Sequence, residues 1–493
     1  MAPAMRNLAA CLMLCCITLV PARADTGMVP DLRLLVDVSE NMEKLDPENL
    51  RALTLEMFVR AVPRGSRVGI WVFGEQAHEL VPSGIVDSAW RQGALEALSS
   101  LEYSGPRTNI PAALEAATAD LEELEDGYRS SVVLLAAGKV DVADSPMINV
   151  SAARKMLSGL AIELGGRGVP VHTIGFAREA DSLLLRSLAR ETGGTSEQAQ
   201  DPSELGGILL KVMEIVVPET RQPLYGREFS VDERVEQFTV LAVFPKLKGK
   251  LKLIAPDGSI YSAQDNPGDF SWFRNRQFSM ARVEIPQQGS WRLQYPAKTD
   301  ARVYVVADLD FEVGALPHYT AAGHEAEVEL RLIERGEPIT DPAILSRYQL
   351  LLEVTSPRGT SERFTLDKTD EDGLYRVITP ALQFPGRYRL MLRLEGEGIE
   401  REMPVYIEVG VPVEQPTLVT RGEEPPEDDF QAVLIRTGFV QMLKNVLAED
   451  DSHIDHGADG DRDARKGDDV GVDPKRLHGD EAHQDCQRQQ RTD

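Results

Sequence analysis

The chain has 493 residues, a formal net charge of −26 at pH 7, and 42% hydrophobic and 27% charged residues. This length exceeds that of one ordinary domain, so we expect about two to four domains. The acidic balance argues against nucleic acid as a partner, because binding to phosphates depends on counterion release by Lys and Arg.

The first residues have the pattern of an export signal. Arg6 supplies a positive charge, residues 9–20 are apolar, and Ala22 and Ala24 stand where a signal peptidase reads small side chains. We expect residues 1–24 to be cleaved, because the apolar run is too short for a good membrane span. Only one of the four cysteines, Cys486, lies outside this segment. The mature chain therefore cannot form an internal disulfide.

Residues 30–217 alternate short apolar strands with helical patterns. The expected strands are 32–36, 67–73, 79–81, 131–135 and 169–176, and the expected helices are 47–62, 109–124, 151–164, 181–191 and 202–217. The connections between them are short. This pattern predicts an α/β doubly wound, Rossmann-like domain whose mostly parallel sheet is covered by helices on both faces.

Three polar or small-residue segments follow expected strands of this domain. The first strand ends in Asp37-Val38-Ser39-Glu40-Asn41, a turn at 103–108 ends in Thr108 and opens a helix, and Leu134-Leu135-Ala136-Ala137-Gly138 closes a buried strand. Ligands of parallel sheets collect beyond the carboxyl ends of the strands. The segments therefore mark a candidate site.

In order and position, these segments resemble the metal-ion-dependent adhesion site of the von Willebrand factor A domain. The resemblance implies that Asp37, Ser39, Asn41 and Thr108 ligate Mg²⁺ or Mn²⁺ and that a partner carboxylate completes the coordination. Asn41 stands where the family has Ser, and Ala137 stands where it has Asp. Losing a carboxylate weakens a largely Coulombic site, so we expect weak metal binding, or none in the free protein.

Simpler interpretations stay open beside this one. The polar residues of the first segment can instead cap the next helix and satisfy loop amides. Asp141 could reach the site through a water, although a plain loop role is the simpler reading. His78 and His172 share no metal-ligand spacing. Residues 137–146 and 192–194 also resemble exported proteobacterial proteins that carry this domain at the front.

The pattern changes to short alternating strands in residues 218–310 and again in residues 311–412. Turns at 256–258 and 357–359 occupy matching places in the two segments. We expect two antiparallel β-sandwich modules, and their Gly-aromatic strand openings resemble those of immunoglobulin-like modules. Three aromatic residues of these modules are expected in the cores: Trp272, Trp291 and Tyr388. No functional site is evident in either module.

The remaining residues divide into three parts. Residues 413–430 are rich in Pro and Glu and predict an extended linker. Residues 431–448 predict a short amphipathic helix, and residues 449–493 predict a disordered acidic tail. The histidines of the tail lack zinc-finger spacing. Translation out of the natural frame would also explain the abrupt change and could have removed a C-terminal membrane anchor.

Together these patterns predict an exported, non-enzymatic protein that binds another protein as an adhesion or scaffolding component of the periplasm or cell envelope. Peripheral association with the envelope is possible, and no small-molecule substrate is evident. A metal-assisted hydrolase is the main alternative, but no catalytic triad can be placed, and Glu40 is the only base near Ser39. A purely structural envelope protein is the other alternative.

Overall fold

The computed structural model describes residues 29–121, 127–137, 139–176, 180–244, 249–314, 316–317, 319–368 and 373–410. The expected signal peptide at 1–24, linker at 413–430, helix at 431–448 and tail at 449–493 lie outside these residues. Within the described ranges, no helix combines the length and apolar character that a membrane crossing requires.

The first domain is built on a six-stranded sheet with the strand order β3-β2-β1-β4-β5-β6. The strands pair in parallel except for β2 and β3, which form a hairpin. The central strands are almost fully buried, as a sheet covered on both faces requires. The predicted mostly parallel sheet is confirmed, and its strands are β1 (Val29–Asp37), β2 (Arg67–Phe73), β3 (Ala77–Ile85), β4 (Tyr128–Ala136), β5 (Val171–Phe176) and β6 (Ser196–Ala199).

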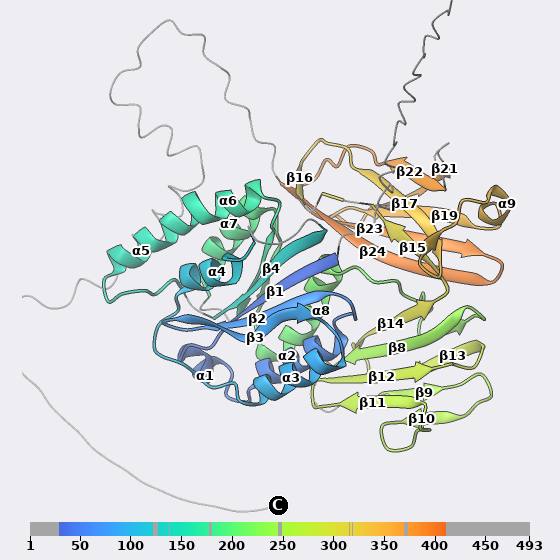
Figure 1. The fold of residues 1–493 in the computed structure, drawn as a ribbon, viewed down its shortest axis with the longest axis horizontal. Coiled ribbons are helices and arrows are strands. Elements are labelled where there is room, and N and C mark those ends of the chain that lie inside the picture. The colour runs from blue at the N-terminus through green and yellow to red at the C-terminus, as the bar shows by residue number, and fades with distance from the viewer. Residues whose placement is uncertain are drawn as a thin grey trace, which may run out of the picture. The chain divides into compact units, whose positions relative to one another are not determined.

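Helices lie on both faces of this sheet (Figure 1). Apolar side chains of α2, α3 and α8 share one core with one face of the strands. A π-helical turn, Met156–Ala161, joins α5 to α6, and a 3₁₀ turn, Pro202–Glu204, precedes α8. The helices are α1 (Asn41–Leu45), α2 (Leu50–Ala61), α3 (Ser88–Ser99), α4 (Ile110–Thr118), α5 (Pro146–Lys155), α6 (Ile162–Gly166), α7 (Ser182–Thr192) and α8 (Leu205–Val216).

Side-chain capping explains where the helices differ from the predicted ranges. The helix expected from residue 47 begins at Leu50, because the Asp46 carboxylate accepts the N–H groups of Leu50 and Arg51, both at 2.8 Å. Helix α3 was not predicted. It begins after Asp87, whose carboxylate accepts the Trp90 N–H at 2.7 Å.

A buried ion network explains the one charge in the apolar run of β1. Arg33 and Asp31 are both fully buried, and Arg33 Nε lies 3.0 Å from Asp31 Oδ2. Arg67 reaches the other oxygen of Asp31 at 2.6 Å, and Asp120 pairs with both arginines. The desolvated charges are therefore paired, which is the condition for burying them.

Two antiparallel sandwiches follow the first domain, as predicted. The first has the sheets β10-β9-β13-β7 and β11-β12-β8-β14 around a core that contains Trp291. The second has the sheets β15-β17-β22-β21 and β16-β24-β23-β19-β20, with β18 paired to β17 and a core that contains Tyr388. β16 joins β24 in parallel, so that one pair departs from the antiparallel pattern.

The strands of the first sandwich are β7 (Glu228–Val231), β8 (Val235–Val243), β9 (Lys252–Ile254), β10 (Ile260–Ser262), β11 (Phe270–Arg274), β12 (Phe278–Glu284), β13 (Gly289–Gln294) and β14 (Asp300–Ala307). The elements of the second are β15 (Leu309–Val313), β16 (Tyr319–Ala321), β17 (Glu327–Glu334), β18 (Glu337–Pro338), α9 (Pro342–Leu345), β19 (Gln349–Thr355), β20 (Ser361–Thr365), β21 (Asp367–Lys368), β22 (Leu374–Ile378), β23 (Gly386–Gly396) and β24 (Ile399–Gly410).

The first domain contacts the first sandwich through α2 and α8. Met57 and Leu210 form a small core with Leu241 and Phe278 of the sandwich. Beside this core, the Thr54 hydroxyl donates to Gln277 Oε1 at 2.9 Å, and both side chains are buried. The contact therefore combines apolar burial with a polar pair, although the Gln277 Nε2 has no hydrogen-bond partner among the described residues.

We expect the stability of the protein to depend on pH through Glu219, in the segment that connects α8 to β7. Burial raises the pKa of Glu219 from 4.5 to about 8, while Arg91 and Arg282 act to lower it and Glu214 and Asp310 act to raise it. Because the folded-state pKa is the higher one, the stability that protonated Glu219 contributes is complete below pH 4.5 and is lost as the pH rises to about 8.

We therefore expect Glu219→Gln, which stays neutral, to become more stable relative to the wild type as the pH rises from about 5.5 to about 9. Urea unfolding at both pH values measures this difference. Glu228→Gln, at an exposed ion pair, is the control. Equal pH slopes for the wild type and Glu219→Gln would contradict the assignment.

The ion network of β1 gives a second prediction. Asp31→Ala leaves Arg33 buried without its carboxylate partner inside the strand, so we expect a loss of about 3 kcal/mol or more in the free energy of unfolding. Glu228→Ala removes an ion pair whose side chains are 47% and 61% exposed. That change should lower the free energy of unfolding by about 1 kcal/mol or less. Similar losses for the two variants, measured by urea unfolding, would show that the β1 network does not stabilise the sheet.

Candidate functional site

Three loops meet at the carboxyl ends of β1, β2 and β4. After β1, the Val38 carbonyl accepts the Ser104 N–H at 2.6 Å, and the Glu40 N–H donates to the Gly105 carbonyl at 2.9 Å. Farther along, Thr108 and Asp141 exchange two backbone hydrogen bonds of 3.2 and 2.9 Å. These bonds bring the first and second predicted segments together and attach the loop that follows β4.

The Asp37 carboxylate lies at the centre of this junction and is fully buried. Its Oδ1 accepts the Ser39 N–H and its Oδ2 accepts the Ala137 N–H, each at 2.9 Å. Burial raises the pKa of Asp37, and these N–H groups act in the opposite direction. The carboxylate therefore fixes the positions of two loops as well as offering a negative charge.

Ser39 and Thr108 are buried beside this junction, with 0% and 1% of their surface exposed. Among the described residues, neither the Ser39 Oγ nor the Thr108 Oγ1 has a hydrogen-bond partner of good geometry, although the Ser39 hydroxyl lies close enough to Asp37 to help lower the pKa of that carboxyl. A buried hydroxyl without a partner costs about 1–3 kcal/mol. Two such hydroxyls in adjoining loops are therefore unsatisfied oxygen donors at the junction.

The other predicted site residues lie in different surroundings. Asn41 is the first residue of α1 and is exposed, so it lies at the rim rather than in the buried junction. The Asp141 carboxylate accepts from Arg107 at 2.9 Å and from Asn149 at 3.2 Å. Its backbone is held beside Thr108, but its charge is paired with Arg107.

Ala137 and Arg51 set the charge of the junction. Ala137 is buried at the end of β4, where its N–H binds Asp37 and its side chain offers no carboxylate. Arg51 of α2 is 1% exposed, donates from Nη1 to the Asp37 carbonyl at 2.6 Å, and lies 5.2 Å from the centre of the Tyr103 ring. Burial lowers the pKa of Arg51, whereas Tyr103, Asp46 and Asp37 raise it.

The prediction from sequence did not include Arg51. The available signal was a charged residue on the helix face that otherwise carries buried residues such as Leu50, Thr54 and Leu55. A charge on a buried helix face requires partners. The sequence could not show which loop would supply them.

The side chains at the junction fit a divalent ion only in part. Asp37, Ser39 and Thr108 offer one carboxylate and two free hydroxyls, which suits Mg²⁺ or Mn²⁺ when waters complete the coordination. The missing carboxylate at Ala137 and the cation of Arg51 both reduce the attraction for such an ion. Among the described residues, no group of three or more His, Cys, Asp and Glu could hold a metal. The residues therefore fit only a weakly held ion.

The fold is a doubly wound α/β domain, and the strand-end junction lies at the carboxyl edge of its sheet. Residues 31–209 match the family model of the von Willebrand factor type A domain. The first domain of this chain is a von Willebrand factor type A domain, followed by antiparallel β-sandwich modules. No curated protein matches the chain.

Several solved structures are similar to parts of the chain. A von Willebrand factor type A protein from Catenulispora acidiphila is 16% identical, with 62% of this chain and 63% of that chain covered and a TM-score of 0.33. Proximal thread matrix protein 1 from the mussel byssus, with a zinc-occupied MIDAS motif, is 17% identical over 41% and 51%, with a TM-score of 0.31. The pilus adhesin SpaC from Lactobacillus rhamnosus GG is 12% identical over 76% and 54%, with a TM-score of 0.33. This chain spans less than two thirds of the length of each of the three.

The charge of the junction is tested by Ala137→Asp, which adds a carboxylate beside Asp37. We expect this variant to be destabilised without metal, because two buried carboxylates repel each other. Excess Mg²⁺ or Mn²⁺ should then stabilise it by about 2.7 kcal/mol at a hundredfold excess over the dissociation constant. The wild type should gain clearly less. Thermal melting with and without metal measures both.

Ala143→Asp is the matched control, because it places the same charge farther along the loop after β4, where Ala143 is only partly buried. If metal raised the melting temperature of the wild type as much as that of Ala137→Asp, the prediction of weak metal binding by the wild type would be wrong. An equal response from Ala143→Asp would show that the added charge acts without forming a site.

Proposed function

We propose that the chain is an exported, non-enzymatic protein that binds a protein partner through the face formed by Asp37, Ser39 and Thr108. The observation that carries the proposal is the pair of buried, unpartnered hydroxyls of Ser39 and Thr108. Polar groups of this kind are satisfied when a ligand binds. Glu40 and Asn41 are exposed beside them and supply a rim that a protein surface can contact.

In this proposal the face depends weakly on a divalent metal or has lost that dependence. Ala137 removes a carboxylate and Arg51 adds a buried positive charge next to Asp37. A partner group then binds to hydroxyls and backbone that the protein already holds in place. Mg²⁺ or Mn²⁺, where it binds, would be held by Asp37, Ser39 and Thr108, with Asn41 at the rim as the fourth proposed ligand.

The arrangement supports binding better than hydrolysis. The Ser39 hydroxyl has no hydrogen-bonded base among the described residues, and Glu40, the acid next to it, is exposed. A serine nucleophile requires a base within hydrogen-bond reach. The metal-assisted hydrolase therefore remains the weaker alternative.

The location and the modules complete the proposal. Export to the periplasm or cell envelope rests on the signal-peptide pattern of residues 1–24 and agrees with the resemblance to exported proteobacterial proteins. The sandwiches serve as spacers that present the von Willebrand factor type A domain. We assign them no binding role at the Asp37 face.

The proposal is tested by capture from an envelope extract on immobilised full-length protein, with and without EDTA. We expect one discrete protein to be captured and to be largely retained in EDTA. Asn41→Lys, at the exposed rim, should abolish its capture, because it adds bulk and charge where the partner sits. Glu362→Lys, exposed on β20, is the matched control and should not change the capture.

The other outcomes contradict specific parts of the proposal. Complete loss of capture in EDTA would show a strongly metal-dependent face. Capture that survives Asn41→Lys would place the partner elsewhere on the protein. The absence of any discrete captured protein would favour the purely structural envelope protein.

A further inference from the structure

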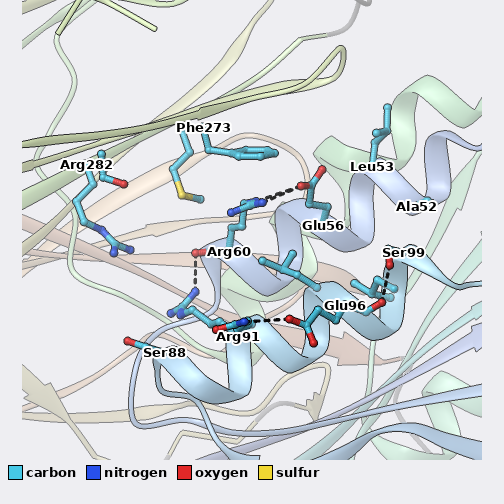
Figure 2. Close-up of a pocket in the computed structure, with 15 residues that line it drawn as sticks. Ala52, Leu53, Glu56, Arg60, Ser88, Arg91, Glu96, Ser99, Phe273 and Arg282 are labelled. Atoms are coloured by element: carbon cyan, nitrogen blue, oxygen red, sulfur yellow. Dashed lines mark hydrogen bonds and ion pairs between the residues drawn. The ribbon is translucent and has the colours of Figure 1, made fainter.

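A second candidate site is a cavity of about 750 Å³ between the first domain and the first sandwich. Helices α2 and α3 supply one side of it, and strands β11 and β12 supply the other (Figure 2). None of the residues that line it belongs to the Asp37 face. Its volume lies within the range of small-molecule pockets, roughly 300–1,000 Å³.

Three guanidinium groups converge at one end of the cavity, those of Arg60, Arg91 and Arg282 (Figure 2). Arg60 forms a 2.9 Å ion pair with Glu56 and lies 3.5 Å from the centre of the Phe273 ring, so its charge is balanced. Neither Arg91 nor Arg282 has a close ion pair of this kind, and Glu219 acts on both of them only from beyond ion-pair distance. No carboxylate of the described residues forms an ion pair with either of them.

Arg91 donates its hydrogen bonds to backbone carbonyl groups. Its Nη1 donates to the carbonyls of Val59 and Arg60, at 2.8 and 2.7 Å, and its Nη2 donates to the carbonyl of Val62. Val59 and Arg60 belong to the last turn of α2 and Val62 is its C-cap residue, so Arg91 caps that helix. The bonds satisfy donors of Arg91 but bring no full negative charge to the cavity.

Arg282 of β12 lines the cavity. Its Nε is buried and has no hydrogen-bond partner in the described part of the chain. A guanidinium offers two parallel N–H groups that match the two oxygens of a carboxylate. The Arg282 side chain therefore lacks the anion that its geometry suits.

The surrounding charges reinforce this imbalance. Burial is the largest of the effects that lower the pKa of Arg91 to about 10; the neighbouring cations Arg282, Arg64 and Arg60 contribute to this lowering, and Glu219 opposes it. Glu219 does not supply a full charge at neutral pH, because burial raises its own pKa to about 8. An anion placed between Arg91 and Arg282 would remove the repulsion between them.

The acidic residues in the lining do not fill this role. Glu56 is paired with Arg60 and also accepts a hydrogen bond from Asn275. Glu96 is exposed and accepts from Gln92 at 2.9 Å. Their charges are therefore either already paired or directed to solvent.

The rest of the lining is largely apolar. Figure 2 shows Leu53 and Ala52 at the end of the cavity away from Arg282. The other apolar lining residues are Leu95, Leu98, Phe273 and Met280. A ligand that satisfies both ends must carry an anionic head and an apolar body.

We propose that this cavity binds a small organic carboxylate with an apolar chain, whose carboxylate pairs with Arg282 beside Arg91 and whose chain lies toward Leu53. The site is separate from the Asp37 face, so it does not depend on the proposed protein partner. The proposed ligand would lie between the first domain and the first sandwich and contact both.

Isothermal titration of the full-length protein with octanoate, octanol and inorganic phosphate tests the proposal. We expect octanoate to bind at least about tenfold more tightly than octanol, because only the carboxylate pairs with Arg282. Octanoate should also bind more tightly than phosphate, which lacks the apolar chain. Arg282→Gln should weaken octanoate by about tenfold or more, since it removes the charge and keeps a long polar side chain.

Two further variants separate the site from effects on folding. Arg274→Gln removes an exposed arginine of β11 that does not line the cavity, and it should leave octanoate affinity unchanged. Leu53→Gln, on the partly exposed side of α2, should weaken octanoate and leave the melting temperature within a few degrees of the wild type. Circular dichroism melting checks that each variant is folded.

Four results would overturn the proposal. These are no octanoate binding at millimolar concentration, equal affinities for octanoate and octanol, equal affinities for octanoate and phosphate, and unchanged octanoate affinity in folded Arg282→Gln. None of these results bears on the Asp37 face. The capture experiment on Asn41→Lys likewise leaves the cavity untouched.

Discussion

The candidate site depends on the two hydrogen bonds that the buried Asp37 carboxylate accepts from the backbone of Ser39 and Ala137. One oxygen orders the loop after β1 and the other attaches the end of β4, so a single side chain fixes the edge of the sheet. The burial that makes these bonds strong also raises the pKa of Asp37. The same carboxylate therefore holds two loops in place and supplies the main negative charge of the face.

The charge balance around Asp37 explains the character of that face. Ser39 and Thr108 have buried hydroxyl oxygens at two of the predicted ligand positions, while Ala137 supplies no carboxylate and Arg51 brings a buried cation to the Asp37 carbonyl. The positions of the oxygen atoms thus favour a bound metal ion, whereas the charges around them disfavour one. Ordered oxygen donors with little net charge are the basis for proposing a protein partner at this face rather than tight binding of a divalent ion.

The contact between the domains has its own physical consequences. The apolar core around Met57 and Leu241 holds α2 and α8 against the first sandwich, and Glu214 of α8 pairs with Arg221 at 2.7 Å and Arg302 at 2.8 Å. At the edge of this contact the surfaces diverge and leave the cavity that Arg282 enters. The sandwiches therefore do more than space the first domain, because one of them completes a pocket that neither part has alone.

The sequence by itself determined the α/β order of the first domain, the two β-rich modules, and the segments that carry Asp37, Ser39 and Thr108. Strand periodicity and strand-end polarity are local signals, and local signals can be read from one chain. The range of α2 was less well predicted, because the Asp46 cap outweighs the apolar pattern that starts earlier. Helix α3 was missed, although the Asp87 cap was present in the sequence.

Only the tertiary structure decided which distant groups meet. It left the Ser39 and Thr108 hydroxyls without partners, placed Arg51 against Asp37, paired Asp141 with Arg107, and put Asn41 at the exposed rim. It also brought Arg91 and Arg282, 191 positions apart in the sequence, to one cavity. The spacing of residues along the chain does not predict these contacts, because they depend on how sheets and helices that are far apart in the sequence pack together.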